Sequence, residues 1–344
     1  MASFLQNRLL GCISVALLIF LYGCSRPKEV PFSGRTMGTT YNIKVVATTF
    51  QKTTGLHAKI DDLLNDINQS MSVYIKDSEI SRFNGLKTFG KKLAVSDDFL
   101  KVMTVSKKLH ILSEGAWDGT VKPLMKLWGF TGKLKKPAVP PAQKIAAVMQ
   151  KVGFDKIEID QNGYLSKNKA TLTLDLGSIA KGYGVDQVAA LLRQKGFKSF
   201  IVEIGGEVYA AGTKANKKSW QAGINRPLVT APLTDVYKIV PLKNQALATS
   251  GNYRQFFEID GMRYAHIIEP ATGYPVQNKV ASVSVVASNC TLADGLATAI
   301  LVMGTTKGLA LLNRLEGVEG LIIEAQADGI LSAHSSAGMR LTDM

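Results

Sequence analysis

The amino-acid sequence predicts an α+β fold, with mixed sheets and packed helices in a single large domain or in two closely joined subdomains. Segments with strand and helix periodicity are mixed along the chain, without the regular alternation that builds a parallel sheet. Beyond Gly196 the pattern changes to short strands between polar turns. At 344 residues, of which 46% are hydrophobic, the chain can bury a large core.

In the first half of the chain, a strand and two helices have clear patterns. Apolar residues alternate from Tyr41 to Val45, which predicts a strand, and an apolar stripe over residues 60–71 predicts an amphipathic helix. Ser96 caps a second helix that ends near Gly115. The sequence predicts four further segments: a stretch too irregular for a core element (71–84), an exposed loop (131–141), a helix (142–151) and a hairpin around residues 161–163.

The second half is predicted to contain short strands and two closing helices. The strands lie at residues 200–204, 236–242, 263–268, 281–286 and 321–323, with polar turns at 248–253 and 266–273. The helices lie at residues 291–303 and 306–315.

The first 24 residues differ from the rest of the chain. Arg8 is their only charge, and residues 13–22 are almost wholly apolar, which is typical of a signal peptide rather than of a spanning helix. The segment ends in Leu21-Tyr-Gly-Cys24, which resembles a bacterial lipobox. Residues 1–23 would then be a lipoprotein signal peptide, with Cys24 lipidated (palmitate among its acyl chains), residues 24–34 a tether and residues 35–344 the domain. An uncleaved anchor is the alternative, and both readings place the body outside the cytoplasm.

Charge and cysteine content limit the function further. The net charge is +14, but the lysines are scattered in loops without an interleaved aromatic platform, which argues against nucleic acid. Such a surface could face anionic lipid, attract a phosphorylated ligand, or serve solubility alone. Cys12 lies in the signal segment and Cys24 would carry lipid, so only Cys290 remains free, which excludes an intramolecular disulfide and a cysteine-rich metal site.

The stretch Asp175-Leu-Gly-Ser-Ile-Ala-Lys181-Gly-Tyr-Gly-Val-Asp186 is the centre of the functional prediction. Residues 171–174 alternate like a strand, and apolar spacing then predicts a helix that stops at Gly196. A helix start offers unpaired N–H groups to a phosphate, and Lys181 adds a cation one turn later. A tightly packed strand–helix turn explains the same glycines equally well.

Several established motifs are absent from the sequence. Tyr183 stands where a Walker A loop needs lysine, and the glycines lack the dinucleotide-fold order. There is no Gly-x-Ser-x-Gly elbow and no His-Glu-x-x-His motif. The four histidines are scattered, and His266 differs from the others only because it ends a strand beside a glycine turn.

A site for a hard metal ion is the stronger candidate. Asp294 and Thr298 are spaced i,i+4 and therefore share one helix face. A carboxylate and a hydroxyl supply oxygen ligands of the kind that Mg²⁺ takes together with water and substrate phosphate. A solvated helix face is the alternative interpretation of the same pair.

Taken together, the chain resembles the ApbE family of FAD-dependent FMN transferases, also called thiamine-biosynthesis lipoproteins. The resemblance covers nearly the whole mature chain, and its landmarks follow in family order: residues 36–40, 71–84, Ala116-Trp-Asp118, Leu127-Trp-Gly-Phe130, 175–186, Ala248-Thr-Ser-Gly251, His266-Ile-Ile-Glu-Pro270 and the helix with Asp294 and Thr298. Ser178 stands where many members have glycine or alanine, and Glu269 where many have aspartate.

The resemblance implies a function and a site. The fold would be ApbE-type and T-fold-like. Members bind FAD and Mg²⁺, transfer the FMN half to a Ser or Thr hydroxyl of another protein and release AMP. The implied flavin-binding residues are Met37, Tyr74, Ala116, Trp117, Asp118, Asp175, Lys181 and Ile268, and the implied Mg²⁺ ligands are Ser178, Asp294 and Thr298.

Within that implied site, Tyr74 and Trp117 would offer aromatic surface, Asp118 and Asp175 would accept hydrogen bonds, and Lys181 would pair with a phosphate oxygen. His266 is the candidate general base, although it could instead contact adenine.

The implied acceptors carry a pattern like Asp-Gly-x-Ser/Thr-Gly-Ala/Ser-Ser/Thr and belong to ion-pumping redox complexes of the membrane. This chain lacks the pattern, so it would modify partners. We therefore expect a lipid-anchored transferase that faces the periplasm, in the inner membrane, with the outer membrane as the alternative. An Mg²⁺-dependent FAD pyrophosphatase and a non-catalytic flavin-binding lipoprotein are the alternatives.

Overall fold

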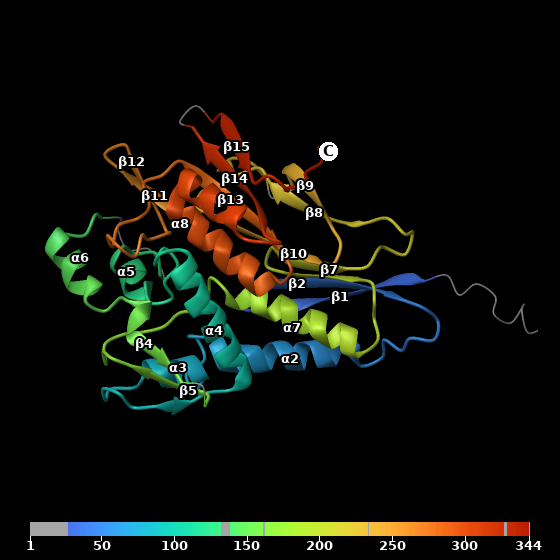
Figure 1. The fold of residues 1–344 in the computed structure, drawn as a ribbon, viewed down its shortest axis with the longest axis horizontal. Helices are drawn as coiled ribbons and strands as arrows, with labels where there is room; N and C mark the ends of the chain where they lie inside the picture. Colours follow the sequence, from blue (N-terminus) through green and yellow to red (C-terminus); the bar gives the residue numbers. More distant parts are fainter. Residues whose placement is uncertain (1–26, 132–137, 161, 233, 327–328, 344) are drawn as a thin grey trace, which may run out of the picture.

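An antiparallel sheet of eight strands is the centre of the computed structural model, which describes residues 27–131, 138–160, 162–232, 234–326 and 329–343 (Figure 1). Each strand pairs antiparallel with its neighbour, in the order β1-β2-β6-β7-β10-β13-β14-β15. The strands are β1 (Lys28–Thr36), β2 (Thr39–Ala47), β6 (Phe200–Ile204), β7 (Glu207–Ala211), β10 (Gln245–Gly251), β13 (Val280–Ala287), β14 (Glu319–Ala325) and β15 (Leu331–Ser335).

Helices cover one face of this sheet. Helix α7 (Ala180–Gln194) packs on β6 and β7, and α8 (Cys290–Arg314) packs on β10 and β13. Behind them lie α2 (Leu56–Met71), which contacts α7, and α4 (Asp97–Leu112), which contacts α8. Alternate side chains of the strands point into this layer, so sheet and helices share one large core that includes Ile43, Val202 and Val283.

A hairpin covers part of the opposite face. Strands β8 (Trp220–Asn225) and β9 (Val236–Leu242) pair with each other and close a second apolar cluster over Val208, Leu247 and Val286. Because β13 lies between both clusters, all of its residues are buried.

Smaller elements surround one end of the sheet. A third apolar cluster joins α5 (Lys122–Leu127) and α6 (Ala142–Met149) to the hairpin of β11 (Phe256–Ile259) and β12 (Met262–Ala265). The remaining elements are α3 (Glu79–Asn84), the short 3₁₀ helix η1 (Phe154–Lys156) and the sheet of β3 (Leu93–Ala94), β5 (Tyr164–Lys167) and β4 (Ile157–Ile159). The chain forms a single domain, because its sheet and main helices share one core.

The structure confirms the predicted α+β class and the strongly periodic elements. The predicted strand at 41–45 lies within β2, the stripe at 60–71 lies in α2, and Ser96 caps α4 by accepting a hydrogen bond from Phe99 N. The hairpin near residue 163 is formed by β4 and β5. The two closing helices meet at Gly304, whose φ of 78° breaks the helical path inside α8.

Four local predictions were wrong. Residues 28–34 were expected in a tether but form most of β1, and residues 248–253 were expected as a turn but largely belong to β10. Within the irregular stretch 71–84, α3 buries Ile80 and Phe83. Residues 171–174 are not a strand of any sheet. The signal peptide and Cys24 lie outside the described residues.

Helix α8 is the only helix in the described part of the chain that is long and apolar enough to cross a membrane by composition. Its packing in the core, however, explains why its residues are apolar. It contacts β10, β13, α7 and α4, and residues such as Leu296 and Ile300 are fully buried in the core. We therefore describe α8 as a central core helix.

Helices α7 and α8 approach each other very closely at Gly182. A Cβ atom on Gly182 would lie 2.4 Å from the carbonyl oxygen of Cys290 and 2.8 Å from Cβ of Asp294. The contact is polar as well, because Gly182 N donates a hydrogen bond of 3.0 Å to Asp294 Oδ2. One turn further along, Asp186 accepts hydrogen bonds from the N–H groups of Cys290 and Thr291, both at 2.8 Å, and so fixes the start of α8.

Gly182→Ala should therefore destabilise the protein. The added methyl group meets backbone, which cannot rotate away, so we expect the free energy of unfolding to fall by about 1–3 kcal/mol in urea denaturation. Gly184→Ala is the matched control on the same helix, because its Cβ would meet the ends of flexible side chains at Met37 and Ile204, 3.0 and 3.3 Å away. Equal stability of the two variants would contradict this account of the helix contact.

Candidate active site

Two adjoining cavities lie at the end of the sheet where α7 begins. The first has a volume of about 390 Å³ and is enclosed by residues from the 116–125 and 266–270 segments, β10 and α8. The second, of about 380 Å³, lies between Met37, the end of α2 and Tyr74. Asp175, Gly177 and Lys181 line both cavities and so form the junction between them.

The structure brings the predicted site residues together at these two cavities. Those that line the first cavity are Ala116, Trp117, Asp118, Asp175, Ser178, Lys181, His266, Ile268, Asp294 and Thr298. Met37 and Tyr74 line the second. Segments separated by more than 250 residues in sequence therefore meet within one site, although their individual roles toward a ligand stay predictions.

A cluster of buried charges lies at the base of the first cavity. Lys181 Nζ lies 2.5 Å from Glu207 Oε2, and the side chain of Glu207 is only 2% exposed. Burial raises the pKa of Glu207 to about 8, and the nearby charge of Asp294 adds to this effect. Burial likewise raises the pKa of Asp294. Lys181 keeps its charge, since burial lowers its pKa but Asp294 and Glu207 raise it by more.

Oxygen atoms from α8 and β10 face the same cavity. Thr298 Oγ1 and Ser250 Oγ lie 2.9 Å apart and share a hydrogen bond. Asp294 Oδ2 accepts from Gly182 N, whereas no described residue donates to Oδ1. Ser178 lines the cavity just before α7, whose N-cap residue is Ile179, and its hydroxyl does not cap the helix.

These donors fit a hard divalent cation. Two buried carboxylates, Glu207 and Asp294, lie beside the single ammonium of Lys181, and burial raises the pKa of both. No cluster of three or more His, Cys, Asp or Glu side chains suited to a metal occurs in the described part of the chain. Carboxylate and hydroxyl oxygens are the kind of donor that suits Mg²⁺, which needs few protein carboxylates when water and phosphate oxygens complete its shell.

Asp118 and Trp117 line the first cavity and also make contacts within the protein. Both carboxylate oxygens of Asp118 accept protein hydrogen bonds: Oδ1 from the N–H (2.7 Å) and hydroxyl (2.5 Å) of Thr120, and Oδ2 from Phe154 N (3.0 Å). The Trp117 side chain is buried and packs edge-on against Phe154, with ring centroids 5.4 Å apart. Both residues therefore shape the cavity wall, whereas Tyr74, at 92% exposed, has the free aromatic face.

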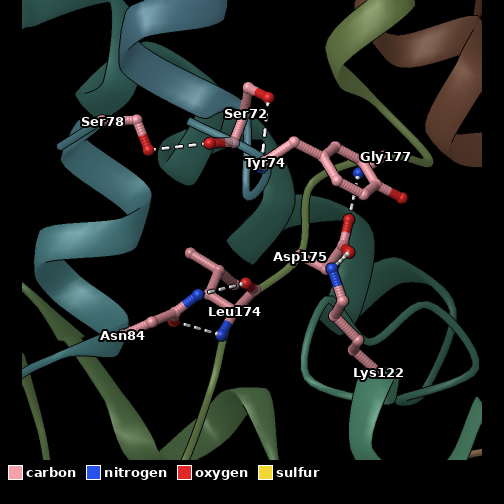
Figure 2. A network of polar contacts seen from close by, with 8 residues as sticks. All are labelled: Ser72, Tyr74, Ser78, Asn84, Lys122, Leu174, Asp175 and Gly177. Carbon is pink, nitrogen blue, oxygen red and sulfur yellow. Dashed lines mark hydrogen bonds and ion pairs between the residues drawn. The ribbon is translucent and has the colours of Figure 1, made fainter. Parts of the chain in front are cut away.

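Asp175 is held by neighbours on both sides (Figure 2). Its Oδ1 accepts a hydrogen bond of 2.9 Å from Gly177 N, and its Oδ2 lies 2.7 Å from Lys122 Nζ. Just before it, the side-chain amide of Asn84 donates to Leu174 O (2.9 Å) and accepts from Leu174 N (2.7 Å). Asn84 thus supplies at Leu174 the hydrogen bonds that a neighbouring strand would have given, and residues 171–174 look like a strand in sequence because Leu172 and Leu174 alternate into the core.

His266 has a defined tautomer when neutral. Its Nδ1 lies 3.2 Å from the carbonyl oxygen of Gln255, which can only accept, so Nδ1 donates and the lone pair is on Nε2. Burial lowers the pKa of His266, which keeps the imidazole neutral near pH 7.

Three residues of the site were not predicted from sequence: Glu207, Ser250 and Lys122. Glu207 follows Gly205-Gly206, a turn that the sequence displays, but nothing in the pattern indicated that its carboxylate is buried. Ser250 had no motif partner in sequence and finds Thr298 only through the pairing of β10 with α8. Lys122 resembles the many other lysines of this basic chain.

A cation, acidic and hydroxyl oxygens and a neutral imidazole converge on one enclosed cavity. These are the groups of an enzyme that acts on phosphate esters or anhydrides. The chain belongs to the ApbE family, whose model matches residues 37–322. The family predicted from the sequence motifs is therefore confirmed.

Known relatives extend over the whole chain. It is similar to a protein of Haemophilus influenzae named FAD:protein FMN transferase, with 40% identity over 97% of each chain. Its fold is similar to the structure of the flavin transferase ApbE from Vibrio cholerae, with a TM-score of 0.81, 40% identity, and 90% of this chain and 98% of that chain covered. The apo form of the Pseudomonas stutzeri flavinyl transferase ApbE gives a TM-score of 0.81 at 35% identity, with 90% and 95% covered.

Proposed function

We propose that this protein transfers the FMN moiety of FAD to a Ser or Thr hydroxyl of an acceptor protein and releases AMP, with Mg²⁺ bound at Asp294. The observation that carries this proposal is the convergence of Lys181, Asp294 and Thr298 on one cavity that adjoins a second cavity of similar size. Two cavities with a charged junction match a dinucleotide, whose two ring systems are joined by a diphosphate.

The charge of the first cavity supports the requirement for a metal ion. Its described lining contains three carboxylates (Asp118, Asp175 and Asp294), besides Glu207, whose pKa of about 8 leaves it mostly protonated near neutral pH, but only two ammonium groups (Lys122 and Lys181). A diphosphate would be repelled by this excess of negative charge. Mg²⁺, held by Asp294, Thr298 and Ser178, would reverse the repulsion and stabilise the charge that develops on the leaving AMP.

His266 is suited to accept the proton of the acceptor hydroxyl. The reaction forms a bond from the hydroxyl oxygen to the phosphorus of the FMN half and breaks the anhydride bond to AMP. The hydroxyl proton must leave as the new bond forms, and Nε2 of His266 has the free lone pair to take it. Lys181 can exchange its contact with Glu207 for a phosphate oxygen during the same step.

We also propose that the protein is anchored to a membrane by lipid on Cys24, faces the periplasm and modifies subunits of membrane redox complexes. The short apolar segment that ends at Cys24 supports the anchor. The inner membrane is favoured because such acceptors lie there. A membrane position would bring the site close to partners that cannot diffuse freely in three dimensions.

The transfer itself is tested with purified protein, FAD, Mg²⁺ and an acceptor domain that carries the flavinylation pattern. We expect a fluorescent acceptor band that survives denaturation, and its loss when the acceptor hydroxyl residue is changed to alanine or when Mg²⁺ is chelated. Asp294→Asn should lower the rate by at least about 100-fold. Free FMN and AMP without acceptor would favour a pyrophosphatase, whereas intact FAD in all reactions would favour a flavin-binding protein.

The role of His266 is tested by the pH dependence of transfer. A general base works when it is deprotonated, and burial lowers the pKa of His266 from its usual value of about 6.5. The rate should therefore begin to fall at a pH below that value. His266→Ala should lower kcat by about 10²- to 10⁴-fold and remove this acidic limb, while FAD binding remains. An unchanged kcat, with weaker FAD binding instead, would assign the residue to nucleotide contact.

The lipid anchor is tested by labelling cells with radioactive palmitate. Cys24→Ala should abolish labelling and retain the full-length precursor, because the signal peptidase for lipoproteins acts only before a modified cysteine. Cys290→Ala is the control, since that thiol is buried in the core and should leave labelling unchanged. Unlabelled wild-type protein that stays in the membrane fraction would indicate an uncleaved anchor.

A further inference from the structure

Lys122 lies where the two cavities meet, although no sequence motif pointed to it. It begins helix α5, with Pro123 behind it in the first turn. Its Nζ lies 2.7 Å from Asp175 Oδ2 and 5.3 Å from the centroid of the Tyr74 ring. One ammonium group therefore contacts two predicted flavin-binding residues that come from different parts of the chain.

Asp175 is the residue whose position this contact controls. It lines both cavities, and it belongs to an extended segment that no sheet holds in place. Gly177 N binds one carboxylate oxygen and Lys122 binds the other, so the two contacts together define the plane of the carboxylate (Figure 2). Without Lys122, the carboxylate would be free to rotate about the single hydrogen bond from Gly177.

Tyr74 depends on the same lysine. Its side chain is almost fully exposed, and its backbone N–H is bound only by the Ser72 hydroxyl in the turn before α3, at 3.3 Å. The cation under the ring restricts an aromatic side chain that otherwise has little packing. Lys122 thereby holds the Tyr74 ring and the Asp175 carboxylate next to each other at the junction of the two cavities.

We propose that Lys122 is a positioning residue for the flavin dinucleotide: it holds Asp175 and Tyr74 in the arrangement that lets FAD bind across both cavities. This inference rests on the proposed function. Lys122 acts through these two neighbours, so its loss should weaken FAD binding and leave the chemical step nearly unchanged, because Lys181, Asp294 and His266 remain in place.

An ordinary ion pair at a protein surface would have little effect. The side chains of Lys122 and Asp175 are 28% and 30% exposed, and pairs of this kind usually change an equilibrium by less than about fivefold. If the loss of Lys122 weakens FAD binding by more than this, without an equal loss of folding stability, the lysine positions the site. A measurement can therefore distinguish a positioning residue from an ordinary surface ion pair.

The test compares Lys122→Met, which keeps the length of the side chain but removes the charge, with the wild-type protein in the presence of Mg²⁺. We expect the KM for FAD and its dissociation constant, from quenching of flavin fluorescence, to rise by about 10-fold or more, with kcat changed less than about twofold. Lys126→Met is the matched control, because Lys126 is on the same helix, is exposed and forms no ion pair with the described residues. Lys122→Arg should restore part of the affinity.

A double variant shows whether Lys122 acts through Asp175. Combined with Asp175→Asn, Lys122→Met should weaken FAD binding little beyond Asp175→Asn alone. Additive effects, or a Lys122→Met protein that binds FAD like wild type, would overturn the proposal. If Lys122→Met loses the fold in thermal unfolding, Lys122→Gln repeats the comparison with a polar side chain. Wild-type protein that binds no FAD would instead refute the proposed function, which keeps the two failures distinct.

Discussion

The site depends on the close contact of α7 and α8 at Gly182. Because this residue has no side chain, the two helices approach until backbone meets backbone, and Gly182 N can bind Asp294 directly. Asp186 then fixes the first residues of α8. A larger residue would separate the helices and move Asp294 away from Lys181. The geometry of the proposed metal site thus depends on Gly182 having no side chain.

The charges gathered there impose a second constraint. Burying the carboxylates of Glu207 and Asp294 is unfavourable, and their raised pKa values reflect this cost of desolvation. The same arrangement would become favourable if the proposed divalent cation and phosphate bind, because each new charge would then have a partner of opposite sign. Lys122 and Asp175 continue this pattern of paired charges to the junction with the second cavity.

The sequence predicted those parts of the fold that local periodicity controls. The stripe of α2, the Ser96 cap of α4 and the break at Gly304 are all readable because each depends on residues within a few positions. Residues 171–174 misled the prediction because their backbone has side-chain partners instead of a neighbouring strand: Asn84 pairs with Leu174, and Lys167 Nζ donates to Leu172 O. Residues 28–34 look polar because β1 is an edge strand that alternates between exposed and partly buried positions.

The sequence by itself determined the family, because the ordered motifs from Met37 to Thr298 are specific as a set. It also identified the residues that gather at the two cavities. Only the tertiary structure showed how each of them is packed and paired. Asp118 has both oxygens bound within the protein, Trp117 is buried, and Tyr74 is exposed, although all three are polar or aromatic residues in equally suggestive motifs. The burial of these side chains and the ion pairs of Lys122 and Glu207 depend on segments that are far apart in the chain. No local pattern of residues encodes such contacts.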